Sequence, residues 1–437
     1  KRVIESEIFK NFWINVQDYD DVNKVIQKYE TQLTLILTYN NYKYLCYIDT
    51  KNFYSSDSNM SSLVLNGGLL IDRGVPFVKI KSFLLHRHPR YIVKLIERFS
   101  LYPTDLIFQH FNTVFNPNIA SIIHNKTITV DGTQLKMKNK IKAAVHYHAY
   151  YPEIASEFFK TIYSYSHYFD FYITTDSIEK RKEIEKMLIE IGVKNIKSIE
   201  VVQNRGRDIL PWINLSEKLS DYEIAGHFHS KKSVRIDSWV GDSWRYEIYK
   251  SLILPIPEIF NILLNNKDIG VIIPDIPYCQ HVFDFNPWGK NIHSCIELWN
   301  KMNCKKNLDL DNLIIPIMPY GTMFWYRPDA LQPLFNLKLK EEDFPKEPFP
   351  VDGTLAHAIE RLPVYIAWSQ GYDFRVVVHK DYILSGFDYL ELKPEIKPEI
   401  QLELNQEMFF LQNVLLKTKT MIFVKWVHKV WKRVKIF

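Results

Sequence analysis

The spacing of apolar residues changes along the chain, and two periods alternate in its middle region. Short apolar runs, typical of strands buried on both faces, occur at residues 141–147, 169–174, 199–202 and 222–228. Segments with helical spacing separate these runs, at residues 152–163 and 177–192 and from residue 209 onward. Strands that alternate with helices of about ten to fifteen residues predict βαβ units and a parallel sheet.

Beyond residue 228 the two periods continue less regularly. Further strands are predicted at residues 269–273, 314–318 and 374–378, and a helix at residues 352–362. A turn at Gly321 is expected to lead into one more strand, which is followed by an Arg and a helix. The predicted fold class is therefore α/β, with a mostly parallel sheet flanked by helices.

These patterns divide the chain into three regions. Residues 1–137 are helix-rich, with helical spacing at 21–37 and 91–99, and hold no cluster of catalytic residue types. We expect an accessory or scaffold role for them. Residues 138–388 contain the alternating strands and helices, and therefore the domain in which a ligand site is expected.

Residues 389–437 form the third region, which we expect to be helical. Residues 417–437 are basic and apolar, with Trp426 and Trp431 among lysines and no acid. A basic amphipathic helix that carries Trp lies in a membrane interface and is attracted to anionic lipid. The segment therefore predicts association with an anionic membrane surface. The alternative is a helix packed on the domain with its lysines in solvent.

Composition narrows the class of protein. With 437 residues the chain has room for two or three domains, and a net charge of +5 without an Arg-rich arm gives no support to nucleic-acid binding. Four cysteines without CxxC spacing fit unpaired thiols in a reducing compartment. Neither a signal peptide nor an apolar run of membrane-spanning length is visible, so a cytoplasmic protein is predicted. Because the chain starts at Lys1 rather than Met, we interpret it as a fragment of a longer protein.

Two polar loops follow predicted strands. The first is Asn204-Arg205-Gly206-Arg207-Asp208, and the second is His229-Ser230-Lys231-Lys232. Because the carboxyl ends of parallel strands meet at one edge of a sheet, the loops are expected to build a ligand crevice. Arginine forks and lysines suit phosphate, so a phosphorylated ligand is predicted. The residues expected to bind it are Asn204, Arg207, Asp208, Lys231 and Lys232.

Two pairs of histidines lie at the same predicted strand ends. His146 and His148 form one pair, and His227 and His229 the other, so each pair is expected to point to one face of its strand. Neutral imidazoles could bind a divalent cation, and protonated ones could bind a diphosphate. In the third alternative each ring is simply hydrogen-bonded at a strand end.

Three further candidates follow other predicted elements. Asp176 could accept a hydrogen bond from a uracil or thymine N–H or from a ribose hydroxyl, or it could cap the next helix. Asp352 could likewise cap a helix, or act as a general base towards a sugar hydroxyl. The turn at Gly321 and Thr322, with Trp325 behind it, could form an acceptor-side wall, although Trp325 is also a good core residue.

Four ordered motifs between about residues 140 and 385 resemble the rhamnan synthesis protein F family of bacterial polysaccharide glycosyltransferases. They are Asn204-Arg205-Gly206-Arg207-Asp208-Ile209, residues 227–233, Gly321-Thr322-Met323-Phe324-Trp325 and residues 352–361. The resemblance implies transfer of a sugar, often L-rhamnose, from a dTDP- or UDP-linked donor to a lipid-linked cell-surface glycan. We expect Asp352 to be the base of an inverting displacement, and the protein to act at the inner face of the cytoplasmic membrane.

A looser similarity runs to the family 2 glycosyltransferases of the Rossmann-like GT-A fold. Asp176 lies where they bind the nucleobase, and His379 lies near a late metal or phosphate ligand. His227 and His229 stand in place of their metal-binding Asp-x-Asp, so two alternatives remain: a Mn or Mg ion at His227, His229 and His379, or no metal. Hard cations prefer carboxylates to imidazoles. In the alternative without a metal, the positive charges of Lys231 and Lys232 replace that of the cation. The first 130 residues are also similar to the tail of a second glycosyltransferase-like module.

Two functions of other classes fit the same residues. A phosphotransferase that moves a polyol phosphate or sugar phosphate would use the same basic loops. A glycan-binding scaffold without catalytic activity would use aromatic side chains and dock at the membrane.

Overall fold

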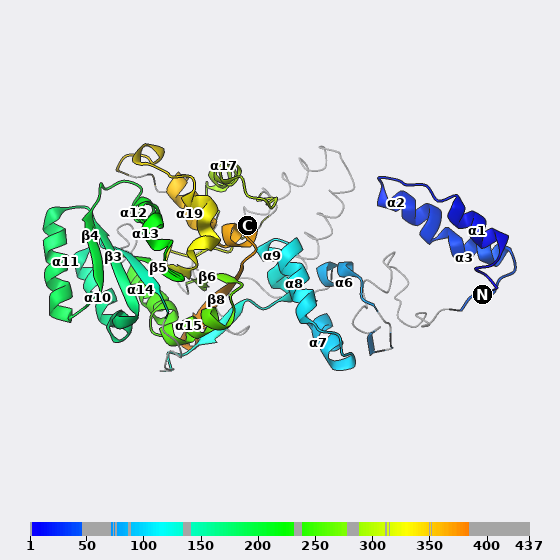
Figure 1. Ribbon diagram of the computed structural model, residues 1–437, viewed down its shortest axis with the longest axis horizontal. Helices are drawn as coiled ribbons and strands as arrows, with labels where there is room; N and C mark the ends of the chain where they lie inside the picture. The colour runs from blue at the N-terminus through cyan, green and yellow to red at the C-terminus, as the bar shows by residue number, and fades with distance from the viewer. Residues whose placement is uncertain are drawn as a thin grey trace, which may run out of the picture. The chain divides into compact units, whose positions relative to one another are not determined.

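The computed structural model describes the chain in several ranges (Figure 1). These are residues 2–45, 71–72, 74, 77–85, 89–133, 141–230, 238–277, 288–310, 313, 315–348, 350 and 352–383. Lys231, Lys232 and the whole segment 389–437, with its predicted membrane helix, lie outside the described residues.

The chain divides into two compact units. The first contains Lys1–His110 and Ile122–His124, and the second contains Phe111–Ser121 and Asn125–Phe437. The helices of the first unit are α1 (Glu7–Ile14), α2 (Val22–Val25), the π-helix η1 (Ile26–Glu30), α3 (Gln32–Tyr39), α6 (Ile80–Leu85) and α7 (Pro89–Phe99). Helices α8 (Asp105–Val114) and α9 (Pro117–Ile123) hold residues of both units. The helices predicted at 21–37 and 91–99 are therefore present.

An eight-stranded sheet forms the second unit, in the order β1-β8-β6-β7-β5-β2-β3-β4. The strands are β1 (Thr127–Val130), β2 (Ala143–His148), β3 (Phe169–Thr175), β4 (Ile196–Val201), β5 (Ile224–His229), β6 (Ile269–Pro274), β7 (Phe324–Tyr326) and β8 (Asp373–His379). All neighbours pair in parallel except β7, which is antiparallel to β5 and β6. The predicted α/β fold with a mostly parallel sheet is confirmed.

Helices follow the strands as the alternating pattern predicts (Figure 1). They are α10 (Pro152–Ile162), α11 (Ile178–Ile191), α12 (Ile209–Asn214), α13 (Ser216–Leu219), α14 (Ser238–Leu252), α15 (Ile256–Asn265), α17 (Ile292–Met302), α18 (Gln332–Phe335), α19 (Leu355–Arg361) and α20 (Pro363–Ser369). Short 3₁₀ turns lie at Tyr163–Tyr168, Pro328–Leu331, Glu341–Asp343 and Lys380–Tyr382. Ser177 caps α11 by accepting from the Lys180 N–H, and Gly192 ends it in the left-handed conformation.

Each face of the sheet buries its own hydrophobic cluster. Trp212 and Phe324 belong to the cluster that also takes in α19 and α20, whereas Trp325 packs with α10, α14 and α15 on the other face. Adjacent strand residues point to opposite faces, which separates Phe324 from Trp325. The Trp325 ring covers Gly226 of β5, where a Cβ atom would come within 2.6 Å of it. Glycine at this position therefore lets β5 and β7 pair.

Two elements differ from the sequence-based expectation. The strand predicted at 314–318 is wrong, because its described residues 315–318 form no strand. Side chains engage its backbone instead: the Ile317 N–H donates to the Tyr365 hydroxyl at 2.9 Å, and the Asn118 amide donates to the Ile315 carbonyl at 2.7 Å. Strand β1 was not predicted, and it pairs with β8 although it precedes residue 138, where the α/β region was expected to begin. Only one of its four residues is buried, which explains its weak apolar signal.

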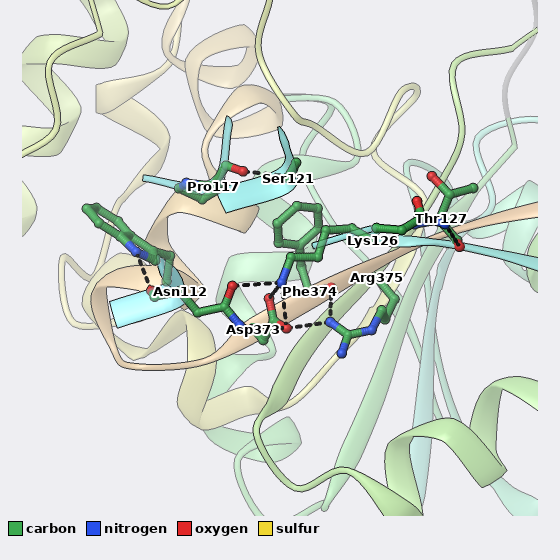
Figure 2. Close-up of polar contacts among 10 residues, drawn as sticks. Asn112, Pro117, Ser121, Lys126, Thr127, Asp373, Phe374 and Arg375 are labelled. Atoms are coloured by element: carbon green, nitrogen blue, oxygen red, sulfur yellow. Dashed lines mark hydrogen bonds and ion pairs between the residues drawn. The ribbon is translucent and has the colours of Figure 1, made fainter. Parts of the chain in front are cut away.

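A buried ion cluster ties α8 to the amino ends of β1 and β8 (Figure 2). The Lys126 ammonium lies 2.8 Å from Asp373 Oδ1 and donates to Asn112 Oδ1 at 2.8 Å. Arg375 donates to the other carboxylate oxygen of Asp373. Burial lowers the pKa of Lys126 to about 8 although Asp373 opposes this effect. Since only 2% of the Lys126 side chain is exposed, each charge in the cluster depends on its partners.

We expect Asp373→Asn to destabilise the protein by about 3–5 kcal/mol, because it leaves two cations without their shared carboxylate. Urea unfolding of the purified protein measures this loss. The matched control is Lys186→Met, which breaks the solvent-exposed pair of Lys186 and Glu190 on α11 and should cost less than about 1 kcal/mol. Equal losses in the two variants would contradict a structural role for the cluster.

Candidate functional site

The carboxyl ends of the parallel strands bring the predicted loops to one edge of the sheet. Strands β2, β3 and β5 lie side by side and end at His148, Thr175 and His229. The loop between β4 and α12 also starts at this edge. Because β7 runs in the opposite direction, its amino end lies there too, just beyond the turn at Gly321 and Thr322.

The register of β2 and β5 sets the two histidine pairs opposite each other. His146 is paired with His227, and His148 with His229. The rings of His146 and His227 stack with their centroids 5.1 Å apart, and their Nδ1 atoms are 3.0 Å apart. All four histidines therefore share the face that also buries Trp212, whose ring stacks on His227 at 4.9 Å.

Asp208 faces these histidines from the start of α12. Its Oδ2 atom lies 3.2 Å from His227 Nε2 and 3.8 Å from His229 Nε2. Burial alone would raise the pKa of Asp208, but the neighbouring His229 and His227 outweigh it and hold this pKa well below its ordinary value. The carboxylate is therefore ionised at neutral pH.

The loop that carries Asp208 is held in a tight turn. Gly206 and Arg207 have φ angles of +67° and +54°, in the left-handed region. A Cβ atom at Gly206 would lie 2.7 Å from Leu210 Cβ, so glycine is required there. The Arg205 guanidinium donates to the Phe344 carbonyl at 2.7 and 3.0 Å, so this arginine anchors the loop.

Thr174 of β3 connects the two histidines of β2. Its Oγ1 atom lies 2.9 Å from His146 Nε2 and 2.9 Å from His148 Nδ1. We refer to Asp208, His227, His146, Thr174 and His148 as the histidine network. The sequence analysis did not single out Thr174. Its position two residues before Asp176, near the end of strand β3, is the signal that could have indicated it, because side chains two apart on a strand point to the same face.

Burial keeps the histidines of the network uncharged. It lowers the pKa of His146 and of His227, and it lowers the pKa of His148 to about 4. The exposed fractions of His146 and His227 are both 0%. A neutral imidazole has one donor and one acceptor nitrogen, so each hydrogen bond in the network has a direction.

The turn at Gly321 is joined to the histidines through its backbone. His229 Nε2 donates to the Gly321 carbonyl at 2.7 Å, and the Gly321 N–H donates to Glu360 at 3.1 Å. Gly321 and Thr322 have positive φ angles, which form the turn. Trp325, by contrast, is fully buried on the opposite face, where its indole N–H donates to the Leu252 carbonyl. That position does not fit the acceptor-side contact predicted for it.

Asp176 and Asn204 lie at the same edge without joining the network. Asp176 Oδ1 is 2.6 Å from the Lys180 ammonium, which in turn lies 3.9 Å from the centre of the Tyr150 ring. The alternative that Asp176 caps the helix is wrong, because Ser177 is the cap. Asn204 is exposed, and so is Arg207, whose guanidinium reaches the Pro350 carbonyl at 3.5 Å.

Asp352 anchors a loop beside this edge. Its two oxygens accept from the Lys290 N–H at 2.8 Å and from the Asn291 side-chain amide at 2.5 Å. Burial opposes ionisation, but these hydrogen bonds outweigh it and lower the pKa of Asp352 below its ordinary value. The capping alternative is wrong here too, since Thr354 stands at the N-cap of α19.

The geometry does not fit the metal site that the sequence indicated. Among the residues that the structure describes, no group of three or more His, Cys, Asp or Glu is arranged to hold a metal ion. Both ring nitrogens of His227 are engaged, one with His146 and one with Asp208. His379 ends β8, which β6 and β7 separate from β5, and its Nδ1 lies 3.3 Å from Asp381 Oδ2.

The fold and this edge define an α/β protein with a polar cluster at the place where open parallel sheets bind ligands. The family model of rhamnan synthesis protein F matches residues 1–372. The chain belongs to this family, as its four motifs indicated. The family takes its name from rhamnan synthesis.

Two curated proteins from two strains of Xanthomonas campestris pv. campestris are similar to about half of the chain. Each is named uncharacterized protein WxcX and is 30% identical over 224 residues. The alignment covers 50% of this chain but 30% of each relative.

Within the described residues, no helix has both the length and the apolar character needed to cross a membrane.

The buried neutral histidines predict a loss of stability in acid. In the unfolded chain a histidine titrates near pH 6.5, whereas burial lowers the folded-state pKa of His148 to about 4 and lowers those of His146 and His227. The unfolded chain therefore binds more protons, and stability falls as the pH drops from about 6.5 towards 4. Each histidine contributes at most about 1.4 kcal/mol per pH unit.

Urea unfolding at several pH values between 7 and 4.5 measures this dependence. His146→Asn should reduce its slope, and His293→Asn, which changes an exposed histidine of α17, is the matched control. The same slope in wild type and His146→Asn would contradict the assignment.

Proposed function

We propose that the protein is a glycosyltransferase. In this proposal it transfers L-rhamnose or another deoxyhexose from a nucleotide diphosphate donor to a lipid-linked cell-surface polysaccharide, such as a capsule, an O-antigen or a rhamnan. The observation that carries the proposal is the meeting of the family's motifs, around Asp208, His229 and Gly321, at the carboxyl edge of the sheet. Ligands of open α/β sheets bind at that edge.

The basic residues of the two loops suit the donor diphosphate. Arg207 is exposed beside the buried Asp208, on a loop that Arg205 anchors. Lys231 and Lys232 follow the end of β5 in the sequence, directly after Ser230. Three cations can balance a leaving diphosphate, whose negative charge grows in the transition state. In this reading no divalent metal is needed.

Asp352 is proposed as the base of a single displacement with inversion. The acceptor hydroxyl oxygen bonds to the anomeric carbon while the bond to the diphosphate oxygen breaks, and the hydroxyl proton passes to Asp352. The lowered pKa keeps this carboxylate ionised, which a base requires, although it also weakens its basicity. Hydrogen bonds from the Lys290 N–H and Asn291 fix its orientation.

Nucleobase recognition and location complete the proposal. Asp176 is proposed to face the base or the ribose, where Lys180 holds its carboxylate. The protein would act at the inner face of the cytoplasmic membrane, with the basic segment 417–437 on anionic lipid.

Binding of nucleotide sugars tests the proposal directly. We expect dTDP-L-rhamnose or a UDP-sugar to raise the melting temperature, and EDTA or added Mn²⁺ to leave this shift unchanged. Loss of the shift in EDTA would show that a metal is needed. A glycan-binding scaffold would give no shift with any nucleotide sugar. A phosphotransferase would instead yield a product that carries an added phosphate, which mass spectrometry detects.

Asp352→Asn should abolish turnover and leave donor binding unchanged, because an amide cannot accept the hydroxyl proton. Product formation by mass spectrometry and donor affinity by calorimetry measure the two effects. The control is Asp329→Asn, which changes an exposed carboxylate at the start of the 3₁₀ turn Pro328–Leu331 and should keep both. Full activity of Asp352→Asn would exclude Asp352 as the base.

A further inference from the structure

The histidine network is a continuous line of hydrogen bonds that ends at the ligand edge of the sheet. It runs from Asp208 to His227 at 3.2 Å and from His227 to His146 at 3.0 Å. It continues from His146 to Thr174 and from Thr174 to His148, each at 2.9 Å. Every member is buried, with an exposed fraction of 9% or less. Water therefore has little access to interrupt the line.

The carboxylate of Asp208 sets the direction of every bond in this line. A carboxylate only accepts, so His227 Nε2 carries a hydrogen, and the Nδ1 atom of this neutral ring accepts from His146 Nδ1. His146 Nε2 then lacks a hydrogen and accepts from the Thr174 hydroxyl. The Thr174 oxygen in turn accepts from His148 Nδ1–H. The last nitrogen, His148 Nε2, is left without a hydrogen.

The opposite direction requires a charge that the site disfavours. If Thr174 donated to His148, the His227 Nδ1 atom would have to donate to His146. His227 would then either be a cation or present a bare Nε2 lone pair to the Asp208 carboxylate. Burial disfavours the cation by lowering the pKa of His227, and two facing acceptors repel each other.

The network ends with His148 at the carboxyl edge of the sheet. His148 is the last residue of β2, at the carboxyl edge and opposite His229. Its Nδ1 atom is engaged by Thr174, and among the residues that the structure describes its side chain has no other hydrogen bond. A bare acceptor nitrogen pairs with a ligand that offers O–H or N–H groups.

A sugar fits this acceptor better than a diphosphate. An ionised diphosphate offers only acceptor oxygens, which a bare ring nitrogen cannot pair with, whereas a hexose offers several hydroxyl donors. We propose that the histidine network fixes His148 as a neutral acceptor for a hydroxyl group of the sugar that the protein transfers. The identity of this ligand rests on the proposed function. His148 then selects the sugar, and binding of the diphosphate is left to the basic loops.

Two substitutions distinguish the roles of the two ring nitrogens of His148. His148→Asn keeps a polar group near the Nδ1 position, in reach of Thr174, and removes the acceptor at the Nε2 position. His148→Gln places an amide oxygen near the Nε2 position and retains an acceptor there. Thr174→Val removes the bridging hydroxyl at nearly constant volume, and Thr174→Ser retains it as the matched control.

Calorimetry on the full chain compares a nucleotide sugar with its matching nucleoside diphosphate, first dTDP-L-rhamnose against dTDP and then UDP-glucose against UDP. We expect His148→Asn to weaken binding of the sugar nucleotide about tenfold, the equivalent of one hydrogen bond, and to leave nucleoside diphosphate binding unchanged. His148→Gln should recover most of the loss. An equal loss for both ligands, or no loss for either, would overturn the proposal.

Nitrogen-15 NMR of the histidine-labelled protein without ligand shows which ring nitrogens carry a hydrogen, and this measurement does not depend on ligand binding. The His148 signals, identified by their absence in His148→Asn, should show hydrogen on Nδ1 and none on Nε2. Thr174→Val should disturb this pattern, and Thr174→Ser should preserve it. Hydrogen on Nε2 in the wild type would overturn the direction of the network and with it the proposal. If no nucleotide sugar binds but the NMR pattern is as expected, the proposed function and the sugar contact fail, whereas the network stands.

Discussion

The ionised carboxylate of Asp208 determines how the polar groups at the carboxyl edge are arranged. A buried carboxylate persists only where hydrogen-bond donors face it, and the His227 ring nitrogen 3.2 Å away supplies one. To face this ring, the loop before α12 adopts left-handed backbone at Gly206 and Arg207 and is anchored at the Phe344 carbonyl. The same charge fixes the tautomer of each ring that follows it. One buried group thus links the loop conformation, the strand register and the chemistry presented to a ligand.

Much of the sheet could be predicted because buried parallel strands are continuous apolar runs. Strands β2, β3 and β5 lie where those runs were read, within about two residues. The order of the strands could not be derived, since it depends on contacts between segments far apart in the sequence. β1 escaped notice because an edge strand with one buried residue has little apolar signal. The apolar segment at 315–318 forms no strand, and the pattern of apolar residues alone could not show this.

The candidate site was predictable only as far as local geometry determines it. Alternation along a strand correctly placed the two histidines of each pair on one face. It could not show that the two pairs lie opposite each other, because the register between β2 and β5 depends on contacts between segments far apart in the sequence. The capping alternatives for Asp176 and Asp352 failed because Ser177 and Thr354 occupy the cap positions. Metal binding at His227 depended on a ring nitrogen that Asp208 already engages. That partner comes from another loop of the fold.

Strand β7 holds the two halves of the sheet together. It is three residues long and lies between β5, which leads to β2, β3 and β4, and β6, which leads to β8 and β1. β5 and β7 are about a hundred residues apart in sequence, so their pairing closes a long loop. During synthesis on the ribosome, strands β2 to β5 can pair with one another long before residues 324–326 emerge. The two halves of the sheet therefore become one only after most of the chain has been made, and a chain that stops before β7 cannot form the complete ligand edge.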